Sequence, residues 1–590
     1  GCGQPSGGPR FKSGSADHHV TTLVPAGWVD TPSFPIREVA DLMQLIVQFV
    51  DPVVYVQLIV ISAATGIFMA RILGLGGLDH NGALCIVEEG EVKSFVELER
   101  ITRQKNVGFD DPNQIEDILD LMSDHNFDVI AVGDIHWWGK KKIWLEPMLK
   151  KYIPNAEIVI HNHHLCHLSA GFYLSPFEEA ITIAIDGKGD GLSTSWTLGL
   201  RGEPVQIAGG QSSWYSLGRL WWAISESCGF PNHHSAGKTM AFGSLGSPRG
   251  FLVNCIRWDG PKFRFEHEGM QGEDWREVNR IKLWCNDLIA SDEFKTASDL
   301  AADLQELTVH IATKMVRFLI REYNCTNICI AGGVALNGLM NQAIIELEGV
   351  NQVFIPPVTD DRGLALGAAL QSAALIGDIP KSKTRCSPYL GPIGTPEEIV
   401  DSDGFKCVAT GRQAERHLAE LLTKGALIAW HQGRSEAGPR ALCHRSLLAT
   451  PTDKKLSERI NSEVKHREWF RPFGCSIIAE DAGDWLMMEG DSPYMLRIVA
   501  VLENMREEVP GIVHLDGTTR PHLVNSDALP ELHSVLSELK GRGHPPMVLN
   551  TSLNRRGEPL SETVSDTFAI ARAMKLEGIY INGKLWISQD

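Results

Sequence analysis

The residues best suited to chemistry are the histidines of the stretch 161–167, His-Asn-His-His-Leu-Cys-His. A strand-like run over residues 157–160 leads into this stretch, and residues 163–172 are typical of a helix. On a helix, His163 and His167 lie four residues apart and face the same side. Two such imidazoles can bind one metal ion, while the second ring nitrogen of each fixes its tautomer through a hydrogen bond. The alternative is a polar helix start whose histidines only bond to their neighbours.

Two parts of the chain share the order strand, acidic glycine turn, strand. The first spans residues 71–98 and has its turn at 76–82, and the second spans residues 180–200 with its turn at 186–191. This repetition predicts an internally duplicated, two-lobed α/β domain. Glycines let backbone N–H groups approach phosphate oxygens, and an aspartate beside them can hold a nucleotide-bound metal. A pair of ordinary hairpins is the alternative.

A third element favours a nucleotide site. A strand expected at 327–330 runs into the double-glycine segment 331–337 and then a helix, an order that suits an anion or a nucleotide. Farther along, Asp361 precedes a small-residue helix at 364–374. Three dispersed elements of this kind resemble the plan of the actin, sugar kinase and heat-shock ATPase superfold, in which nucleotide lies between the lobes. Lys238 is then either a phosphate contact in the cleft or a solvated lysine.

Positive charge gathers towards the C-terminus of an otherwise acidic chain. A strand at 426–430 leads to Pro439, a residue typical of a first helical turn, so we expect Arg440 and Arg445 to flank a helix N-terminus. Arginine forks grip oxygens two at a time, which favours a pocket for a phosphorylated substrate over surface salt bridging. The strand at 547–550 precedes polar side chains suited to a nucleotide or an acyl phosphate. The further cations are Lys465, Arg467, Arg471 and Arg520.

The composition limits the classes of function. The chain has 590 residues, too many for a single core, and its 43% hydrophobic and 22% charged residues are ordinary for a soluble globular protein. Its net charge of -18 argues against nucleic acid as a partner, because phosphate binding needs a basic face. The cysteines are scattered without a Cys-x-x-Cys pair, which argues against a zinc ribbon or a disulfide framework and favours the reducing cytoplasm.

The first 68 residues form a separate segment. Residues 53–70 are nearly all apolar, and their length is near the lower limit for a membrane span of roughly 17–25 residues. No basic flank precedes them and Pro52 abuts them, so we do not expect a membrane partner. Met69 is either the natural start, with everything earlier extraneous, or part of a real extension. The expected division is an N-terminal extension at 1–68, one domain at 69–385 and another at 386–590.

Several short motifs stand out together: His163-His164-Leu165-Cys166-His167, Ile185-Asp186-Gly187, Ala331-Gly332-Gly333-Val334, Pro356-Pro357 with Asp361, Gly438-Pro439-Arg440-Ala441-Leu442, Arg467-Glu468-Trp469-Phe470-Arg471-Pro472-Phe473 and Leu549-Asn550-Thr551-Ser552. With these motifs the chain resembles the NodU/CmcH/TobZ-type O-carbamoyltransferases over residues 69–590. The resemblance implies a TsaD-like domain over 69–385, with the duplicated actin-like ATPase plan. It also implies an α+β YrdC-like domain over 386–590.

The resemblance also implies a two-step activity. In that family the C-terminal domain makes carbamoyl adenylate from carbamoyl phosphate and ATP, which binds with Mg2+. An acceptor hydroxyl then attacks the carbamoyl group in the N-terminal domain, and AMP leaves. By resemblance, the metal, expected as Fe2+, is held by His163, His167 and Asp361, and carbamoyl phosphate is held by Arg440, Lys465 and Arg520. The residues implied for the nucleotide and the carbamoyl adenylate are Asp186, Gly187, Gly332, Gly333, Asn337, Ser446, Arg471, Ser552 and Asn554.

Histidines are also the candidates for catalysis. His80 is expected to be the general base, because an imidazole with a pKa of ~6.5 suits that role, although a plain turn histidine is the alternative. His164 is a candidate to orient the carbamoyl group. Relatives have an acidic residue four positions before the cleft lysine Lys238, where this chain has His234, so either His234 substitutes for the acid or the acceptor differs. Some relatives carry a histidine where Asn106 stands.

We therefore predict an ATP-dependent O-carbamoyltransferase acting on a hydroxyl of a small molecule, either a natural product or a sugar. The expected partners are ATP, carbamoyl phosphate and this acceptor, with a homodimer as an alternative to a monomer. One competing interpretation is a nucleotide-binding regulator of the heat-shock or actin type, which leaves the cationic pocket without a purpose. Another is a tRNA threonylcarbamoylation enzyme, against which the acidic charge balance speaks.

Overall fold

The computed structural model describes residues 70–589, apart from 122–125, 232, 271, 292, 382–385 and 393–403. The predicted extension at 1–68 and most of the apolar segment at 53–70 lie outside the described residues. Within the described ranges, no helix combines the length and the apolar character needed to cross a membrane. No disulfide bond joins the cysteines of this part of the chain.

The first sheet has five strands. β1 (Arg71–Gly76) runs antiparallel to β2 (Ala83–Glu88), which pairs in turn with β3 (Glu91–Glu97). On its other side β1 runs parallel to β4 (Val129–Gly133), and β4 runs parallel to β5 (Glu157–His161). Every residue of β4 is buried, as expected for a strand covered on both faces. The helices of this lobe are α3 (Leu98–Thr102), α4 (Pro112–Leu121) and α5 (Ile135–Tyr152).

The second sheet repeats the order of the first. β6 (Glu179–Gly189) runs antiparallel to β7 (Leu192–Leu200), which pairs antiparallel with β8 (Gly209–Ser212). On its other side β6 runs parallel to β11 (Asn327–Ala331), and β11 runs parallel to β12 (Gln352–Phe354). The order β8-β7-β6-β11-β12 therefore matches β3-β2-β1-β4-β5 strand for strand. The duplication predicted from the two acidic glycine turns is present in this topology.

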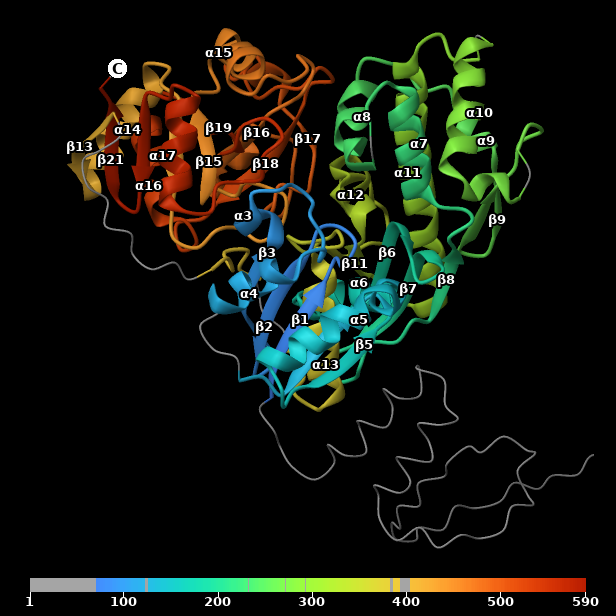
Figure 1. The fold of residues 1–590 in the computed structure, drawn as a ribbon. Helices are drawn as coiled ribbons and strands as arrows, with labels where there is room; N and C mark the ends of the chain where they lie inside the picture. The colour runs from blue at the N-terminus through green and yellow to red at the C-terminus, as the bar shows by residue number, and fades with distance from the viewer. Residues whose placement is uncertain are drawn as a thin grey trace, which may run out of the picture. The chain divides into compact units, whose positions relative to one another are not determined.

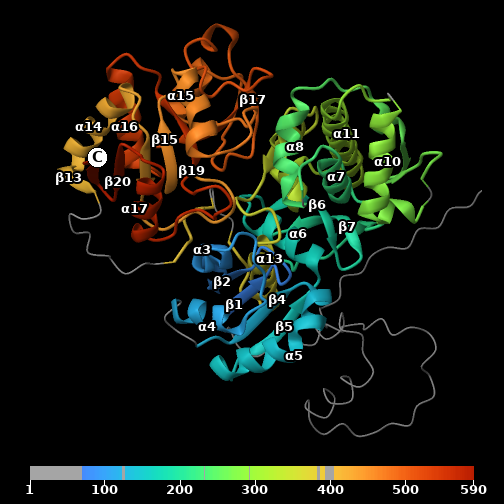
Figure 2. The ribbon, with the colours of Figure 1, turned by 45° about the horizontal axis from the view of Figure 1, so that its top comes forward.

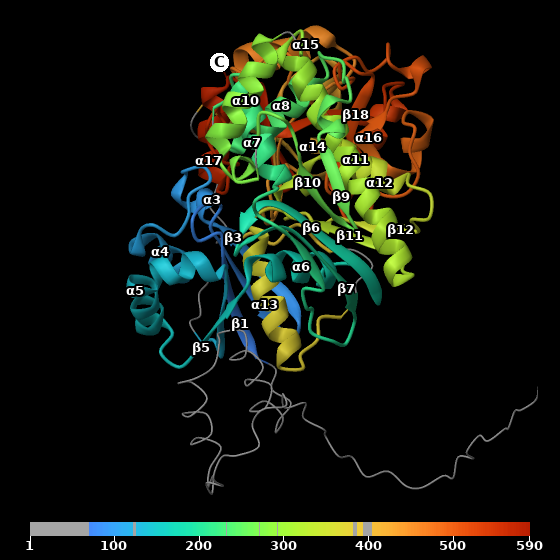
Figure 3. The same ribbon diagram turned by 90° about the vertical axis from the view of Figure 1, so that its right-hand side faces the viewer.

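Two helices pack against each other next to these sheets. α13 (Gly363–Leu375) packs on β1 and β4, whereas α6 (His163–Tyr173) packs on β6 and β11 (Figure 3). A Cβ atom at Gly367 of α13 would lie 1.9 Å from the carbonyl oxygen of Cys166 in α6, so the two backbones approach as closely as only glycine allows. The N-terminal ends of these two helices carry the predicted metal ligands.

A helical layer from residues 217–345 packs beside the second sheet (Figure 2). Its longest helix is α11 (Ala297–Tyr323), which begins with a capping box between Thr296 and Asp299 and buries one apolar stripe. It ends at Asn324, which adopts the left-handed conformation that terminates helices. The remaining elements here are α7 (Leu217–Ser227), α8 (Ala236–Gly243), α9 (Phe251–Asn254), α10 (Val278–Ala290), α12 (Gly338–Ile345) and the hairpin of β9 (Ile256–Asp259) with β10 (Lys262–Phe265).

The strands from residues 405–588 form one mixed, nine-stranded sheet (Figure 1). Its order is β13 (Phe405–Thr410), β21 (Lys584–Ser588), β20 (Gly578–Ile581), β14 (Ile428–His431), β15 (Arg445–Ala449), β19 (Met547–Ser552), β16 (Gly474–Ile478), β18 (Thr518–Val524) and β17 (Val499–Ala500). The helices of this part are α14 (Gly411–Thr423), α15 (Lys454–Arg459), α16 (Pro530–Gly541) and α17 (Val564–Ala573).

One predicted element is wrong. No helix begins at Pro439, because the residues after it form bends and Arg445 already starts β15. The buried carboxylate of Glu436 accepts the N–H groups of Leu442 at 2.7 Å, His444 at 2.8 Å and Arg445 at 2.9 Å. These bonds satisfy backbone donors that a helix would have used and shape the segment into a loop.

Candidate metal centre and cationic pocket

His163 and His167 project from one face of α6, as their spacing predicted. Strand β5 leads to Asn162, whose side chain accepts hydrogen bonds from the N–H groups of His164 and Leu165 and so caps the helix. Both histidines are buried, and their Nε2 atoms lie 3.2 Å apart. The cap and the spacing thus bring two imidazole nitrogens to one point.

Two carboxylates complete this cluster. The Oδ1 atom of Asp361 lies 3.5 Å from Nε2 of His167 and 3.7 Å from Nε2 of His163. The Oδ2 atom of Asp186 lies 3.4 Å from Nε2 of His163. One ligand atom from each of the four residues lies within 4.8 Å of the others. The sequence had assigned Asp186 to carbamoyl adenylate and missed its place beside the histidines.

Asp134 fixes the far side of the His163 ring. Its Oδ2 atom lies 3.0 Å from Nδ1 of His163, and its Oδ1 accepts the N–H of Trp137 at the start of α5. A carboxylate can only accept, so Nδ1 of His163 carries a proton, and Nε2 of the same ring faces Asp186 and Asp361. Sequence reasoning missed Asp134, although its position directly after the buried strand β4 is a usable signal.

Three carboxylates surround His163 and make the site electronegative. Burial opposes a charge on this ring, but Asp361, Asp134 and Asp186 outweigh burial and raise the pKa of His163 well above its ordinary value. Conversely, burial disfavours ionisation of Asp186, and the imidazoles outweigh it and lower its pKa. Two imidazoles and two carboxylates in such a site fit a divalent metal ion, iron among them. The residues present therefore fit the predicted centre.

The other histidines lie in two different environments. Nε2 of His80 is 3.6 Å from Oδ2 of Asp361, and the exposed His234 ring lies edge-on to the His80 ring with centroids 5.7 Å apart. His164 is buried, with Nδ1 2.9 Å from Oγ of Ser195. Its Nε2 has no hydrogen-bond partner among the described residues. Burial lowers the pKa of His164 to about 3, so this ring is neutral at ordinary pH.

The two glycine loops meet at Asp186. The N–H of Gly333 donates to Oδ1 of Asp186 at 3.0 Å, and Gly187 continues the strand beyond it. Gly332 has φ +86°, and a Cβ atom there would lie 2.3 Å from the carbonyl oxygen of Ile185. This junction therefore requires glycine at position 332.

Two of the predicted nucleotide residues are bonded within the protein. Oδ1 of Asn337 accepts the N–H of Met340, which caps α12, and its amide exchanges hydrogen bonds of 3.1 and 2.8 Å with Gln305. Oγ of Ser446 accepts the N–H of Cys443 at 3.1 Å. Both side chains thus stabilise their own loops, and contact with a nucleotide stays a prediction.

Four guanidinium groups whose charges act on one another make up the predicted cationic pocket, which we define by Arg440, Arg467, Arg471 and Arg520. Burial lowers the pKa of Arg440 to about 10 and that of Arg467 to about 9, with the charge of Arg471 adding to both shifts. Burial and the other three cations lower the pKa of Arg520. The Nε atoms of Arg440 and Arg520 are buried and lack a hydrogen-bond partner among the described residues. An anion would relieve this repulsion and accept these bonds.

Lys465 holds the loop beside this pocket. Its ammonium donates to the carbonyl oxygen of Ser552 at 2.5 Å and to the carbonyl and Oδ1 oxygens of Asn554, both at 2.8 Å. Oγ of Ser552 also donates to Oδ1 of Asn554 at 2.7 Å. All three ammonium protons are thus used within the protein. Burial first, and then the nearby cations, lower the pKa of Lys465 well below its ordinary value.

Two contacts join the cationic pocket to the N-terminal half. Nη2 of Arg440 donates to the carbonyl oxygen of Leu336, in the double-glycine segment, at 3.2 Å. Nζ of Lys238 lies 3.1 Å from Oε1 of Glu468, whose other oxygen is 3.5 Å from Arg471. Lys238 is therefore paired with a carboxylate rather than simply solvated, and a phosphate contact by Lys238 stays a prediction.

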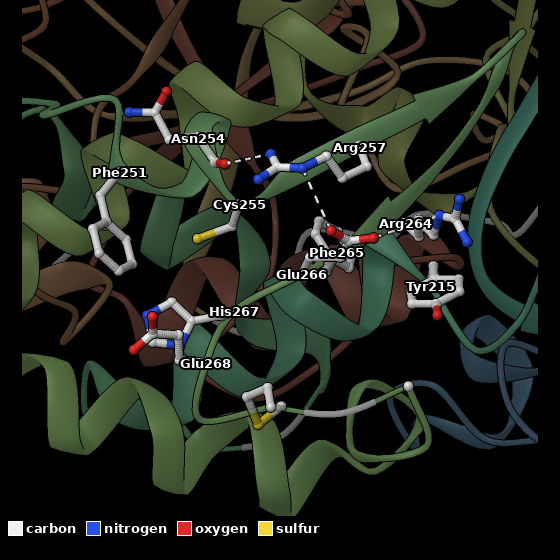
Figure 4. Close-up of a pocket in the computed structure, with 12 residues that line it drawn as sticks. Tyr215, Phe251, Asn254, Cys255, Arg257, Arg264, Phe265, Glu266, His267 and Glu268 are labelled. Carbon is white, nitrogen blue, oxygen red and sulfur yellow. Dashed lines mark hydrogen bonds and ion pairs between the residues drawn. The ribbon is translucent and has the colours of Figure 1, made fainter.

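A separate pocket of about 680 Å³ lies beside the β9–β10 hairpin (Figure 4). Its two arginines, Arg257 and Arg264, both face Glu266, at 3.4 and 3.7 Å. None of the residues predicted for catalysis or binding lines it.

Comparison with known proteins defines the class. The family model described as Carbamoyltransferase N-terminus matches residues 135–370, and the one described as Carbamoyltransferase C-terminus matches residues 419–588. The duplicated α/β fold and the buried cluster thus belong to a carbamoyl-transferring enzyme. The chain is a member of the carbamoyltransferase family, and its enzyme class is that of the O-carbamoyltransferases. The regulator considered from the sequence is set aside by this membership.

Named relatives agree with this assignment. Nodulation protein NolO of Bradyrhizobium diazoefficiens is 30% identical, over 71% of this chain and 77% of that protein. The 3'-hydroxymethylcephem-O-carbamoyltransferase of Amycolatopsis lactamdurans is 33% identical, over 44% of this chain and 48% of that enzyme. Among solved structures, HypF of T. kodakarensis matches with a TM-score of 0.36 and 16% identity, over 53% of this chain and 49% of that one.

Proposed function

We propose that this enzyme is an ATP-dependent O-carbamoyltransferase that works in two half-reactions. Activation takes place in the C-terminal half and transfer in the N-terminal half. The observation that carries the proposal is the pair of buried Nε donors on Arg440 and Arg520, which have no partner among the described residues and lie within mutually repelling guanidinium groups. A phosphorylated substrate neutralises such a group, and carbamoyl phosphate supplies both the anion and the group to be transferred.

The first half-reaction makes carbamoyl adenylate. Water cleaves carbamoyl phosphate to carbamate and phosphate, a carbamate oxygen attacks the α-phosphorus of ATP bound with Mg2+, and pyrophosphate leaves. Arg440 and Arg520 hold the phosphate oxygens, where fixed positive charge stabilises the charge that develops. Lys465 keeps the loop of Ser552 and Asn554 beside the nucleotide. Arg471 belongs to the same pocket, and Ser446 is proposed to contact the nucleotide.

The second half-reaction transfers the carbamoyl group. The acceptor hydroxyl attacks the carbamoyl carbon, the bond from that carbon to the adenylate oxygen breaks, and AMP leaves with the electron pair. His80 takes the hydroxyl proton at Nε2, next to the exposed His234. His164 is neutral and its Nε2 is unpartnered among the described residues, which suits a hydrogen bond to the carbamoyl group.

The metal ion belongs to the second half-reaction. His163, His167, Asp186 and Asp361 would hold it, and Fe2+ is the ion that the sequence led us to expect. When bound, the ion supplies positive charge that offsets the adenylate phosphate and polarises the carbamoyl group. Asp134 keeps the Nε2 lone pair of His163 directed into the cluster.

The acceptor is proposed to be a small molecule with a hydroxyl group. Support comes from the name of a relative that carbamoylates a hydroxymethylcephem. Beside the cluster lie the imidazoles of His80 and His234, the latter in place of an acidic residue.

Pyrophosphate release tests the first half-reaction. Purified enzyme with ATP and Mg2+ should release pyrophosphate only when carbamoyl phosphate is added. Reactions with a library of alcohols and sugars should then show, by mass spectrometry, a carbamoyl mass gain on one acceptor class. Pyrophosphate release that does not depend on carbamoyl phosphate would contradict the proposal. Carbamoyl transfer only to tRNA would favour the threonylcarbamoylation alternative.

A further inference from the structure

A buried network of five charged side chains lies where β3 and α3 contact the loops of both candidate sites. Its members are between 2% and 10% exposed, and they carry three carboxylates and two guanidiniums. None of them belongs to the metal cluster or to the cationic pocket. They are Glu97, Glu99, Arg100, Asp360 and Arg362.

One end of the network holds the segment of the metal ligand Asp361. Arg362 follows this ligand directly, and its guanidinium lies 3.1 Å from Glu97 and 3.1 Å from Glu99, and also pairs with Asp360. Nη2 of Arg362 in addition donates to Oδ1 of Asn106 at 3.3 Å. These contacts fix the backbone on both sides of Asp361 against the segment that follows β3.

The other end holds the loop of Arg440. Oε1 of Glu97 accepts the N–H of Gly438 at 2.7 Å. Nη2 of Arg100 donates to the carbonyl oxygens of Gly438 at 3.0 Å and Glu436 at 3.2 Å. Arg440 lies two residues beyond Gly438, so these bonds fix the backbone from which the Arg440 side chain extends.

The two loops also touch each other directly. Gly438 has φ +96°, and a Cβ atom there would lie 2.3 Å from the carbonyl oxygen of Pro357, just upstream of Asp361. Glu436 organises the rest of the same loop by accepting three backbone N–H groups. A single carboxylate, that of Glu97, therefore contacts both Arg362 and Gly438, one on each loop.

A buried ion pair is weak evidence for stability, because the free energy lost when the two charges leave water is about as large as the free energy gained from their attraction. Well-packed apolar side chains would stabilise the contact between the two halves equally well. The charged network differs because its hydrogen bonds are directional, so each one fixes a particular backbone atom of one loop relative to the other loop. Misplacement of reacting groups by about 1 Å can cost about 100-fold in rate.

We infer that Glu97, Arg100 and Arg362 are positioning residues that hold the loop of Arg440 in a fixed position relative to the segment of Asp361, so that carbamoyl adenylate passes between the two sites instead of escaping. The inference rests on the proposed two-step function. Its signature is a loss of coupling: pyrophosphate continues to form, while less carbamoylated product appears for each pyrophosphate.

Two conservative variants test it in the full chain. Glu97→Gln keeps an oxygen for the Gly438 N–H but removes the charge facing both arginines. Arg100→Lys keeps the positive charge but replaces the guanidinium, whose Nη2 donates to both carbonyl oxygens, with an ammonium on a shorter side chain. With the acceptor found by the library, we expect pyrophosphate formation within about threefold of the parent enzyme. The product formed per pyrophosphate should fall by about 10-fold or more, with free carbamoyl adenylate or its breakdown products in solution.

Arg103→Ala is the matched control. Arg103 ends the same short segment and donates to the carbonyl oxygens of Arg100, Pro559 and Leu560, but among the described residues it has no hydrogen bond or ion pair with either site loop. The control should keep the parent ratio of product to pyrophosphate. An unchanged ratio in both test variants, or an equal loss in the control, overturns the inference, as does failure of both test variants to fold. If the parent enzyme itself releases no pyrophosphate with carbamoyl phosphate, the proposed function fails instead.

Discussion

Replacing Asp134 with asparagine should weaken Fe2+ binding by about 10- to 100-fold, because Asp134 orients His163, a proposed metal ligand, and is not itself one of the proposed ligands. Its two oxygens serve two donors, the N–H of Trp137 at 2.9 Å and Nδ1 of His163 at 3.0 Å. Asparagine has only one acceptor oxygen, so either α5 loses its cap or the His163 ring loses the bond that fixes its tautomer. The expected loss corresponds to about 1.4–2.7 kcal/mol of binding free energy.

An anaerobic titration of metal-free enzyme with Fe2+ against a chromophoric chelator measures this loss. Asp303→Asn is the matched control, since Asp303 is a buried aspartate that accepts the N–H groups of Gly250 and Leu252 at the start of α9 and contacts no cluster residue. Both variants should lower the melting temperature, but only Asp134→Asn should lower the metal affinity. Equal affinity in Asp134→Asn and the parent enzyme would refute the reasoning.

Three further outcomes are expected. Arg520→Met should weaken carbamoyl phosphate binding at least about 10-fold in a thermal-shift titration. The melting temperature without ligand should stay the same or rise, because one of several cations that repel each other is removed. A clear drop in that melting temperature would contradict the repulsion. Glu436→Gln should reduce the loss of unfolding free energy at acid pH, measured by urea denaturation. Burial opposes ionisation of Glu436, but nearby cations and N–H groups outweigh it and lower the pKa of this carboxyl group. Its ionised form therefore stabilises the fold above the unfolded pKa of ~4.3, and this contribution is lost as the pH falls below it. Parallel acid limbs in variant and parent would argue against this. Gly332→Ala should lower the free energy of unfolding by more than about 1 kcal/mol and slow carbamoyl transfer. The backbone has φ +86° at this position, and a Cβ atom would lie 2.3 Å from the carbonyl oxygen of Ile185. An unchanged free energy of unfolding would contradict that packing.

Local patterns were sufficient to predict most strands of the two five-stranded sheets and the shared helix face of His163 and His167. The spacing of His163 and His167, with Asn162 as a cap, involves only neighbours in sequence, and the helix formed as predicted. The repeated strand order likewise followed from hydrophobic runs and glycine turns. Features of this kind depend on periodicity, which a single sequence displays.

Contacts between distant segments could not be predicted in the same way. Asp186 joined the histidines because α6 packs on β6, and the helix expected at Pro439 was replaced by a loop because the buried carboxylate of Glu436 competes for its N–H groups. Lys238 meets Glu468 across more than two hundred residues of chain, and no local pattern marks either as a partner. From the sequence alone, the charged residues of the network around Glu97 look like ordinary surface residues.

Two separate reaction sites in one chain are the central claim, and transfer from supplied carbamoyl adenylate tests it most directly. Lys465→Ala should stop pyrophosphate release with carbamoyl phosphate and ATP yet still carbamoylate the acceptor when given carbamoyl adenylate. His163→Ala should show the reverse, with pyrophosphate released and no transfer from the supplied intermediate. If each folded variant lost both half-reactions together, the two-site account would be contradicted.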